Sequence, residues 1–206
     1  MENSVDIPQI ILIGGTSHTG KSTLARALAS KLKGKYLATD KLARHPGRPW
    51  KNEKSLTIKL HVLEHYRSLS APELISDVMI HYHHNVLPQV RNLVENHNYN
   101  NYLIIEGSAL YPSLVKDIIS NEKVRGVWLV GSYSLLKNRI FANSNFYNAS
   151  KEERYLIYKF FQRTWLYNRA MLNDLTSLGL EWIQVNCNIT TEKLIDRTLW
   201  ELKKQQ

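Results

Sequence analysis

A glycine-rich segment near the amino end places the strongest constraint on what this chain can fold into. Residues 15–22 read Gly-Thr-Ser-His-Thr-Gly-Lys-Ser and match the pattern G-x-x-x-x-G-K-[ST] at every fixed position. The apolar run at residues 9–14 is typical of a strand buried on both faces of a parallel sheet, and the helical spacing of apolar residues over 21–32 predicts a helix. Backbone N–H groups in such a loop, together with the positive end of the helix, would surround phosphate oxygens.

The same loop predicts how a nucleotide and its metal would be held. We expect Lys21 to reach the β- and γ-phosphates of ATP and the Ser22 hydroxyl to bind Mg²⁺. The variable positions of the loop face the same ligand, so the whole segment is expected to contribute. The expected cofactor-binding residues are Gly15, Thr16, Ser17, His18, Thr19, Gly20, Lys21, Ser22 and Thr23.

Strand and helix patterns alternate along the rest of the chain. Further strands are expected at residues 35–39, 101–106, 124–131 and 181–186, and further helices at about 53–69, 72–97, 112–121, 134–142, 151–178 and 190–203. Ser70 with Glu73 predicts a capped helix start, and Gly179 predicts the end of the long helix. The alternation predicts one α/β domain over residues 1–206, with a parallel sheet of about five strands flanked by helices.

The loop, its flanks and the order of the elements resemble the P-loop kinases that phosphorylate nucleotides and small metabolites. The resemblance covers the whole chain in outline, and the loop is its one specific motif. It implies the three-layer P-loop NTPase fold, a helical acceptor-binding region at about residues 40–97 and a lid at about residues 139–165. GTPases are less similar, because no N-K-x-D motif follows an apolar strand.

Two carboxylates follow expected strands. In shikimate-kinase-like and gluconate-kinase-like proteins an aspartate at the position of Asp40 acts on the acceptor hydroxyl and helps to hold the metal, so the resemblance implies that Asp40 is a general base or orienting group. A helix N-cap is the alternative role for Asp40. Glu106 precedes Gly107, and uridine-kinase-like and 2-phosphoglycerate-kinase-like proteins carry an acidic-Gly pair there that faces the Mg²⁺ water or the acceptor. Both carboxylates remain candidate bases.

The positive charge is concentrated in two segments. Of the formal net charge of +9, residues 33–59 carry +6 and residues 151–169 carry +3. Arg44 and Arg48 lie in the first segment, and because guanidinium groups match phosphate and carboxylate oxygens, they predict binding of a small anionic acceptor. A solvated basic loop is the alternative reading of this segment.

Arginines also flank the Asn-rich segment 143–150, which is expected to be a mobile loop. The resemblance implies a lid there whose arginines close over the phosphates, with Arg139 as the catalytic arginine and Arg154 as a substrate-binding one. Arg163 and Arg169 fit either the lid or an exposed, solvated helix face.

Together these patterns favour an ATP-dependent kinase that uses Mg²⁺ and acts on a small anionic acceptor. A single cysteine, no apolar run long enough to cross a membrane and no signal peptide lead us to expect a cytoplasmic protein without a membrane partner, either a monomer or a homodimer. The alternative is an ATP-binding regulatory or nucleic-acid-binding protein without small-molecule kinase activity. Its support is the net positive charge.

Overall fold

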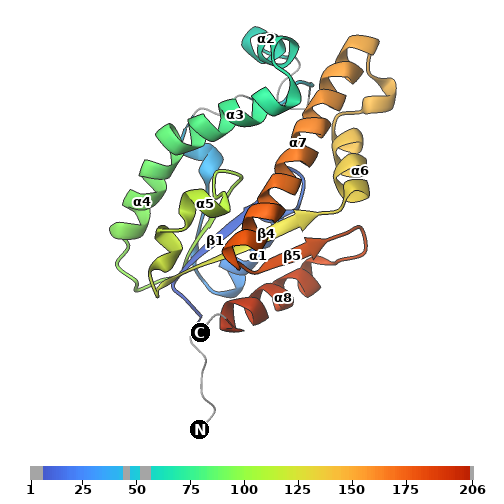
Figure 1. Ribbon diagram of the computed structural model, residues 1–206. Coiled ribbons are helices and arrows are strands. Elements are labelled where there is room, and N and C mark those ends of the chain that lie inside the picture. The colour runs from blue at the N-terminus through green and yellow to red at the C-terminus, as the bar shows by residue number, and fades with distance from the viewer. Residues whose placement is uncertain (1–6, 44–46, 52–56, 205–206) are drawn as a thin grey trace.

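A single parallel sheet forms the centre of the molecule (Figure 1). The computed structural model describes residues 7–43, 47–51 and 57–204. The sheet has the order β2-β3-β1-β4-β5, and its strands are β1 (Ile10–Gly15), β2 (Lys35–Ala38), β3 (Leu103–Glu106), β4 (Val124–Gly131) and β5 (Trp182–Val185). The expected α/β fold with about five parallel strands is confirmed.

The strand register brings the carboxyl ends of the central strands to one edge. Ile13 of β1 pairs with Glu106 of β3, which in turn pairs with Ala38 of β2. Every residue of β1 is buried, as expected for a central strand covered on both faces. Because the chain leaves β1, β2 and β3 at the same edge, the glycine-rich loop, Asp40 and Glu106 meet there.

Helices cover both faces of the sheet. On one face, α1 (Lys21–Lys31) and α8 (Thr191–Lys204) pack through leucines against β1 and β4. On the other face lie α4 (Leu87–Glu95), α5 (Pro112–Val115), η3 (Ile118–Ser120) and the lower half of α7 (Lys151–Leu178). The expected closing helix at 190–203 is α8. This arrangement gives the three layers that the sequence predicts.

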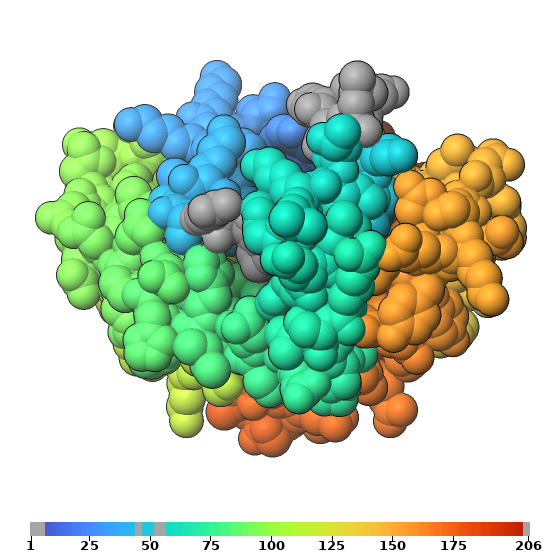
Figure 2. Space-filling view, turned by 90° about the horizontal axis from the view of Figure 1, so that it is seen from above, coloured from blue at the N-terminus to red at the C-terminus, as the bar shows by residue number. Residues whose placement is uncertain are grey.

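A third apolar cluster lies beyond the carboxyl edge of the sheet. Here α2 (Leu60–Ser68), α3 (Ala71–His81) and α6 (Tyr133–Asn143) pack around the upper half of α7, with Tyr66 and Phe160 among the fully buried side chains. Seen from above, α2 and α3 lie between the α4 segment and the α6–α7 segment (Figure 2). These helices therefore form walls around the edge where the loop and the two carboxylates meet.

Two expected helices are divided in the structure. The helix expected over 72–97 consists of α3, a π-helical turn η2 (Tyr82–Val86) and α4. Pro88, in the first turn of α4, cannot donate a backbone hydrogen bond, and the widened turn before it accommodates this loss. The helix expected over 112–121 is α5 followed by η3, and the one expected over 53–69 is α2 within the described residues.

The Asn-rich segment between α6 and α7 contains a short 3-10 helix, η4 (Phe146–Asn148). Phe146 stacks on Phe141 of α6 with ring centroids 3.8 Å apart, so this turn packs against the helix that precedes it. The expected helix caps are confirmed: Ser70 and Glu73 form a capping box, and Gly179 ends α7 in a left-handed conformation. Within the described residues, no helix has the length and apolar character needed to span a bilayer.

Candidate functional site

The glycine-rich loop connects β1 to the first turn of α1. Gly15 and Gly20 have φ of 139° and 98°, values that residues other than glycine rarely adopt. Lys21 is buried, and its Nζ donates a hydrogen bond of 2.8 Å to the Thr16 carbonyl. Burial lowers the pKa of Lys21, while the nearby charges of Glu106 and Asp40 oppose this shift. The loop thus presents a cation and backbone amides to the same point.

A cavity of about 270 Å³ opens above this loop. It is polar, and it collects side chains from the loop, from the ends of β2 and β3, from α6 and from α7. Its lining residues are Ser17, His18, Gly20, Lys21, Ser22, Thr23, Asp40, Arg48, Glu106, Gly107, Ser108, Asn143 and Phe160. Most of the residues predicted from the sequence to act on phosphate, metal or acceptor therefore share one cavity.

Glu106 is held firmly at the end of β3. It is only 5% exposed, and its Oε1 accepts hydrogen bonds from the Ser22 hydroxyl at 2.9 Å and from the Tyr36 hydroxyl at 3.0 Å. Burial, followed by the charge of Glu106, raises the pKa of Tyr36, so this hydroxyl stays a donor at neutral pH. Glu106 therefore lies on the Ser22 side of the cavity. Tyr36 is a site residue that the sequence analysis missed, because its position in a strand gave no sign of this contact.

Asp40 differs from Glu106 in its surroundings. It lies in η1 (Thr39–Lys41), just after β2, and its side chain is exposed at the cavity. Among the described residues, no hydrogen bond or ion pair to Asp40 is found. Thr39 packs so closely on Gly107 that a Cβ there would lie 1.7 Å from the Thr39 hydroxyl oxygen. This contact joins the ends of β2 and β3 and brings the two carboxylates to the same cavity.

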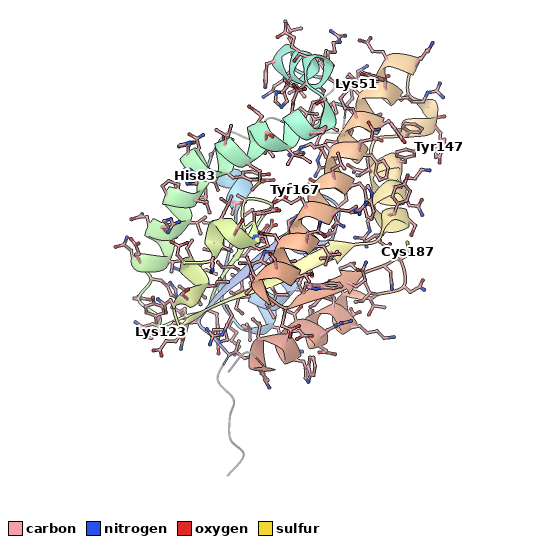
Figure 3. The ribbon with its side chains drawn as sticks, viewed as in Figure 1. Lys51, His83, Lys123, Tyr147, Tyr167 and Cys187 are labelled. Carbon is pink, nitrogen blue, oxygen red and sulfur yellow. The ribbon has the colours of Figure 1, made fainter. Side chains whose placement is uncertain are left out.

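A short strap, residues 47–51, closes one side of the cavity. Trp50 packs edge-to-face on Phe160 of α7 at 4.8 Å between ring centroids. Lys51, labelled in Figure 3, forms an ion pair of 3.5 Å with Glu153 of α7. Arg48, also in the strap, lines the cavity and donates a hydrogen bond of 3.1 Å to Asn143 at the end of α6. Arg48 was expected at the site from the sequence; Arg44 lies outside the described residues.

A second, smaller cavity of about 140 Å³ lies on the other side of the loop. Arg139 of α6 lines it, together with Gly20 and residues that follow β5, including Ile189 and Thr190. Arg139 also donates a hydrogen bond of 3.0 Å from Nη1 to the His18 carbonyl. Arg139 therefore lies at the loop, beside this second cavity. The segment after β5 gave no sequence signal for such a position.

For Arg163 the sequence left open whether it belongs to the lid or to an exposed, solvated helix face. It lies on α7, with its guanidinium 5.8 Å from the Phe160 ring centroid, and its positive charge acts on the buried hydroxyls of Tyr66 and Tyr82. Burial raises the pKa of both tyrosines, so their hydroxyls are neutral at pH 7. In the described part of the chain, no carboxylate forms an ion pair with Arg163, and Arg163 is not among the residues that line the cavity above the loop.

The other predicted lid arginine lies away from this cluster. Arg154, in the first turns of α7, is exposed and does not line the cavity above the loop. Tyr147 of η4 is 77% exposed at the outer tip of the α6–α7 turn (Figure 3). The structure thus brings Arg139 and Arg48 to the loop but leaves Arg154 at a distance from the cavity.

Helix α7 is fixed to the sheet edge by buried polar contacts. The Asn168 side chain forms two hydrogen bonds of 3.0 Å with the backbone of Gly131, at the end of β4. The Tyr167 hydroxyl, in the interior, donates to the Ser108 carbonyl after β3 (Figure 3). Thr16 of the loop donates a bond of 3.4 Å to the Thr164 carbonyl. These contacts set the position of Phe160 and Arg163 relative to the loop.

Comparisons with known proteins give similarity in structure but not in sequence. No protein-family model matches the chain, and no curated protein matches its sequence. The structure is similar to a gluconokinase from Sinorhizobium meliloti 1021, with a TM-score of 0.54 and 15% identity over 97% of this chain and 94% of that chain. It is also similar to a shikimate kinase from Aquifex aeolicus, with a TM-score of 0.54 and 14% identity over 95% and 97% of the two chains.

A third similar structure is a deoxyadenosine kinase from M. mycoides with bound dATP. Its TM-score is 0.52, and the 13% identity extends over 94% of this chain and 98% of that chain. All three matches extend over nearly the full length of both proteins, so they concern the whole architecture and not the glycine-rich loop alone. The chain therefore has the fold of the P-loop kinases.

Proposed function

We propose that this protein is a kinase that transfers the γ-phosphoryl group of ATP to a small anionic acceptor. The observation that carries this proposal is one cavity that combines Lys21 and Ser22 of the loop with two carboxylates, Asp40 and Glu106, and with Arg48. Phosphoryl transfer needs little covalent chemistry from the protein and depends on positioning and charge stabilisation, which these groups supply. The fold and the kinases that share it support the same reading.

The donor would lie along the glycine-rich loop, with its phosphates on Gly15–Ser22. Lys21 is buried beneath the cavity and would hold the β- and γ-phosphates, while the loop amides and the start of α1 add favourable dipoles. The second cavity, beside Arg139 and Thr190, adjoins the loop at Gly20 and would take the nucleoside end of ATP. Arg139 lines this second cavity and donates a hydrogen bond to the His18 carbonyl of the loop, so it would contact the phosphates.

The oxygen atoms at Ser22 and Glu106 fit Mg²⁺. The Ser22 hydroxyl lies 2.9 Å from the Glu106 carboxylate, and the described residues contain no group of three or more His, Cys, Asp or Glu side chains that could form a complete metal cage. Mg²⁺ commonly takes one or two protein oxygens together with substrate phosphates and water. When bound, Mg²⁺ would neutralise charge on the phosphates. Ser22 would bind it directly, with Asp40 and Glu106 placed to hold its water ligands.

The acceptor would lie on the opposite side, between Asp40 and Arg163. Asp40 is exposed at the cavity and would orient the acceptor hydroxyl or take its proton. Arg163, unpaired with any described carboxylate, would bind the negative group of the acceptor, and Arg48 would complete the positive charge around the cavity. Phe160 and Trp50 would exclude water, which limits the hydrolysis of ATP. Residues of about 40–97 would form the acceptor-binding region and about 139–165 the lid.

Two measurements test this proposal. Calorimetry with MgATP and MgADP should detect binding that Lys21→Ala weakens strongly, while the exposed Lys203→Ala serves as a matched control. ADP release should then be screened with carboxylated and phosphorylated sugars, polyols and nucleosides against the hydrolysis in water alone. An acceptor that raises ADP release, and is itself phosphorylated, would establish the activity. Absence of MgATP binding would refute the proposal.

The acceptor screen, combined with a measurement of DNA and RNA binding at several salt concentrations, separates the kinase from the alternative of a nucleic-acid-binding protein. Contacts to several phosphates of DNA or RNA would make binding weaken steeply with salt. Tight, salt-dependent binding of RNA or DNA together with no phosphorylated acceptor would favour the alternative.

A further inference from the structure

His18 adopts an unusual backbone conformation within the loop. Its φ is 66°, in the left-handed region, which costs a residue with a side chain about 1–2 kcal/mol and a glycine nothing. Its ring packs near Trp50 of the strap and edge-on to Phe160 of α7, with centroid distances of 6.2 and 6.1 Å. Strain of this kind persists where surrounding contacts impose it, and such positions cluster at functional sites.

Asn143 joins His18 to Arg48. Its Oδ1 accepts a hydrogen bond from Arg48 Nη1 at 3.1 Å and lies 3.4 Å from His18 Nε2. An amide oxygen has two lone pairs and can accept both bonds, which makes Nε2 the protonated nitrogen of a neutral His18. Arg139, one turn earlier on α6, donates to the His18 carbonyl. The last turn of α6 therefore holds both the ring and the backbone of His18.

The charge state of His18 suits this arrangement. Burial, followed by the positive charge of Arg48, lowers the pKa of His18 to about 4, and Lys21 and Arg139 act in the same direction. The side-chain hydrogen bond with Asn143 opposes the shift. At neutral pH the ring is therefore uncharged and adds no repulsion to the three cations around it.

Arg48 and Lys21 repel one another across the cavity, and the charge of Arg48 contributes to lowering the pKa of Lys21. A long, flexible arginine side chain would move away from a second cation unless other contacts restrained it. Asn143 restrains Arg48 by a hydrogen bond, the Trp50 ring lies 5.8 Å below its guanidinium, and Asp40 attracts it. Two cations, Arg48 and Lys21, are thereby kept at the same cavity before any anion binds.

We propose that His18 and Asn143 are positioning residues that hold Arg48 over the phosphate cavity, where its guanidinium binds oxygens of the phosphoryl group in transit. The inference rests on the proposed kinase function. It differs from the expectation drawn from the sequence, which placed the phosphoryl-stabilising arginine in the lid and Arg48 at the acceptor. A guanidinium that is already oriented loses little freedom when negative charge develops on the transferred group, which is the basis of preorganised stabilisation.

The test compares binding of MgADP with binding of MgADP plus aluminium fluoride, which mimics the phosphoryl group in transit. Arg48→Ala, Asn143→Ala and His18→Ala should each weaken the aluminium fluoride complex by about 10- to 100-fold, the range expected for a lost charge-assisted hydrogen bond. The affinity of Arg48→Ala and Asn143→Ala for MgADP should stay within about 2-fold of the wild type, since MgADP lacks the transferred group. His18→Ala, which alters the loop proposed to hold the diphosphate, should weaken the aluminium fluoride complex more than it weakens the MgADP complex. Arg197→Ala, Asn173→Ala and His83→Ala, all at exposed positions, are the matched controls.

Coupling between the residues separates positioning from a structural role. Asn143 and His18 are proposed to act through Arg48. Adding Asn143→Ala or His18→Ala to Arg48→Ala should therefore lower the affinity for MgADP with aluminium fluoride no further than Arg48→Ala does alone. Asn143→Asp keeps the side-chain oxygen that accepts the hydrogen bonds, and His18→Gln keeps a side-chain N–H donor. Both variants should therefore keep most of the wild-type affinity for the aluminium fluoride complex.

Three outcomes would overturn the inference. The first is that the losses of affinity add up in the double variants. The second is that a variant loses as much affinity for MgADP as for the aluminium fluoride complex. The third is that Arg48→Ala binds the aluminium fluoride complex as tightly as the wild type does. If the wild-type protein fails to bind MgADP at all, the proposed kinase function fails with it. If the wild-type protein binds MgADP but the His18 and Asn143 variants bind MgADP with aluminium fluoride as tightly as the wild type does, only the positioning role is refuted.

Discussion

The two sides of the cavity, the proposed donor side and the proposed acceptor side, are built in different ways. On the donor side, the backbone of Gly15–Ser22 and the hydrogen bonds of Glu106 with Ser22 and Tyr36 fix the geometry over a short stretch of chain and two adjacent strands. Opposite the loop, Asp40, Arg48 and Arg163 come from η1, the strap and α7, with Trp50 beside Arg48 and Phe160 beside Arg163. Substitutions should therefore affect donor binding locally and acceptor binding through packing.

The largest expected effect lies on the donor side. Lys21→Ala should lower kcat by about 10²- to 10³-fold, as found when one preorganised donor to the developing charge is removed. The fold should survive, because within the described residues the side-chain hydrogen bond of Lys21 goes to Thr16 of its own loop. Steady-state kinetics with the acceptor from the screen, together with circular dichroism, would measure this. Full turnover in Lys21→Ala would show that the loop is not the donor site.

The two carboxylates provide a direct comparison of the two sides. Asp40→Asn should lower kcat by about 10²-fold or more, because an amide cannot take the acceptor proton, and it should change the Mg²⁺ requirement less than Glu106→Gln does. Glu106→Gln should instead raise the Mg²⁺ concentration needed for half-maximal rate, because the carboxylate next to Ser22 is lost. Mg²⁺ titrations of both variants would measure the difference. The reverse pattern would exchange the two assignments.

Substitution of Arg163 tests whether the acceptor is recognised through a negative charge. Arg163→Ala should raise the KM for the acceptor by about 10- to 100-fold, the loss of a charge-assisted hydrogen bond, and leave MgADP affinity unchanged. Arg169→Ala, at an exposed position on the same helix, is the control. Arg163→Ala should weaken the binding of a neutral analogue of the acceptor less than it weakens the binding of the charged acceptor. Equal losses for both analogues would mean that Arg163 supports packing and not charge recognition.

The smallest expected effect concerns pH and His18. Its pKa in the folded protein, about 4, lies below its ordinary value of 6.5, so the unfolded state binds the proton more readily as the pH falls. Stability is unaffected above about pH 6.5 and declines from there toward pH 4, by roughly 2 kcal/mol between pH 7 and pH 5. Urea unfolding at both pH values should show this decline reduced in His18→Gln, which does not titrate. An identical decline in both proteins would mean that His18 is not buried as a neutral ring.

Local patterns were sufficient for the donor side. The fixed positions of the G-x-x-x-x-G-K-[ST] motif, followed by a helix, specify the loop because its geometry depends on glycine dihedrals and on consecutive backbone amides. The placement of Glu106 also followed from sequence, since a carboxylate that ends a buried parallel strand must lie at the same edge as the loop. The partner of Glu106, Tyr36, could not be predicted, because the sequence does not show which strands are neighbours.

The acceptor side could be predicted only in part. Asp40 and Arg48 were expected near the cavity from their position after β2, and both line it. Arg163 could not be distinguished from a solvated arginine, because its surroundings of Tyr66 and Tyr82 come from α2 and η2, far away in the sequence. Arg154 was expected to bind substrate, whereas the helix phase of α7 leaves it exposed. The π-helical turn η2 was also unforeseen, since a local widening before Pro88 leaves the apolar pattern nearly unchanged.

The sequence by itself determined the glycine-rich loop between a strand and a helix, the alternation of strands and helices, and the edge of the sheet at which the candidate site residues gather. These features depend on contacts between residues close in the chain and on the fixed direction of parallel strands. Only the tertiary structure decided which side chains meet across that edge: Tyr36 with Glu106, Asn143 with Arg48 and His18, and Arg163 with its tyrosines. Those contacts depend on how helices pack, which follows from the shape of the whole core and not from any local pattern.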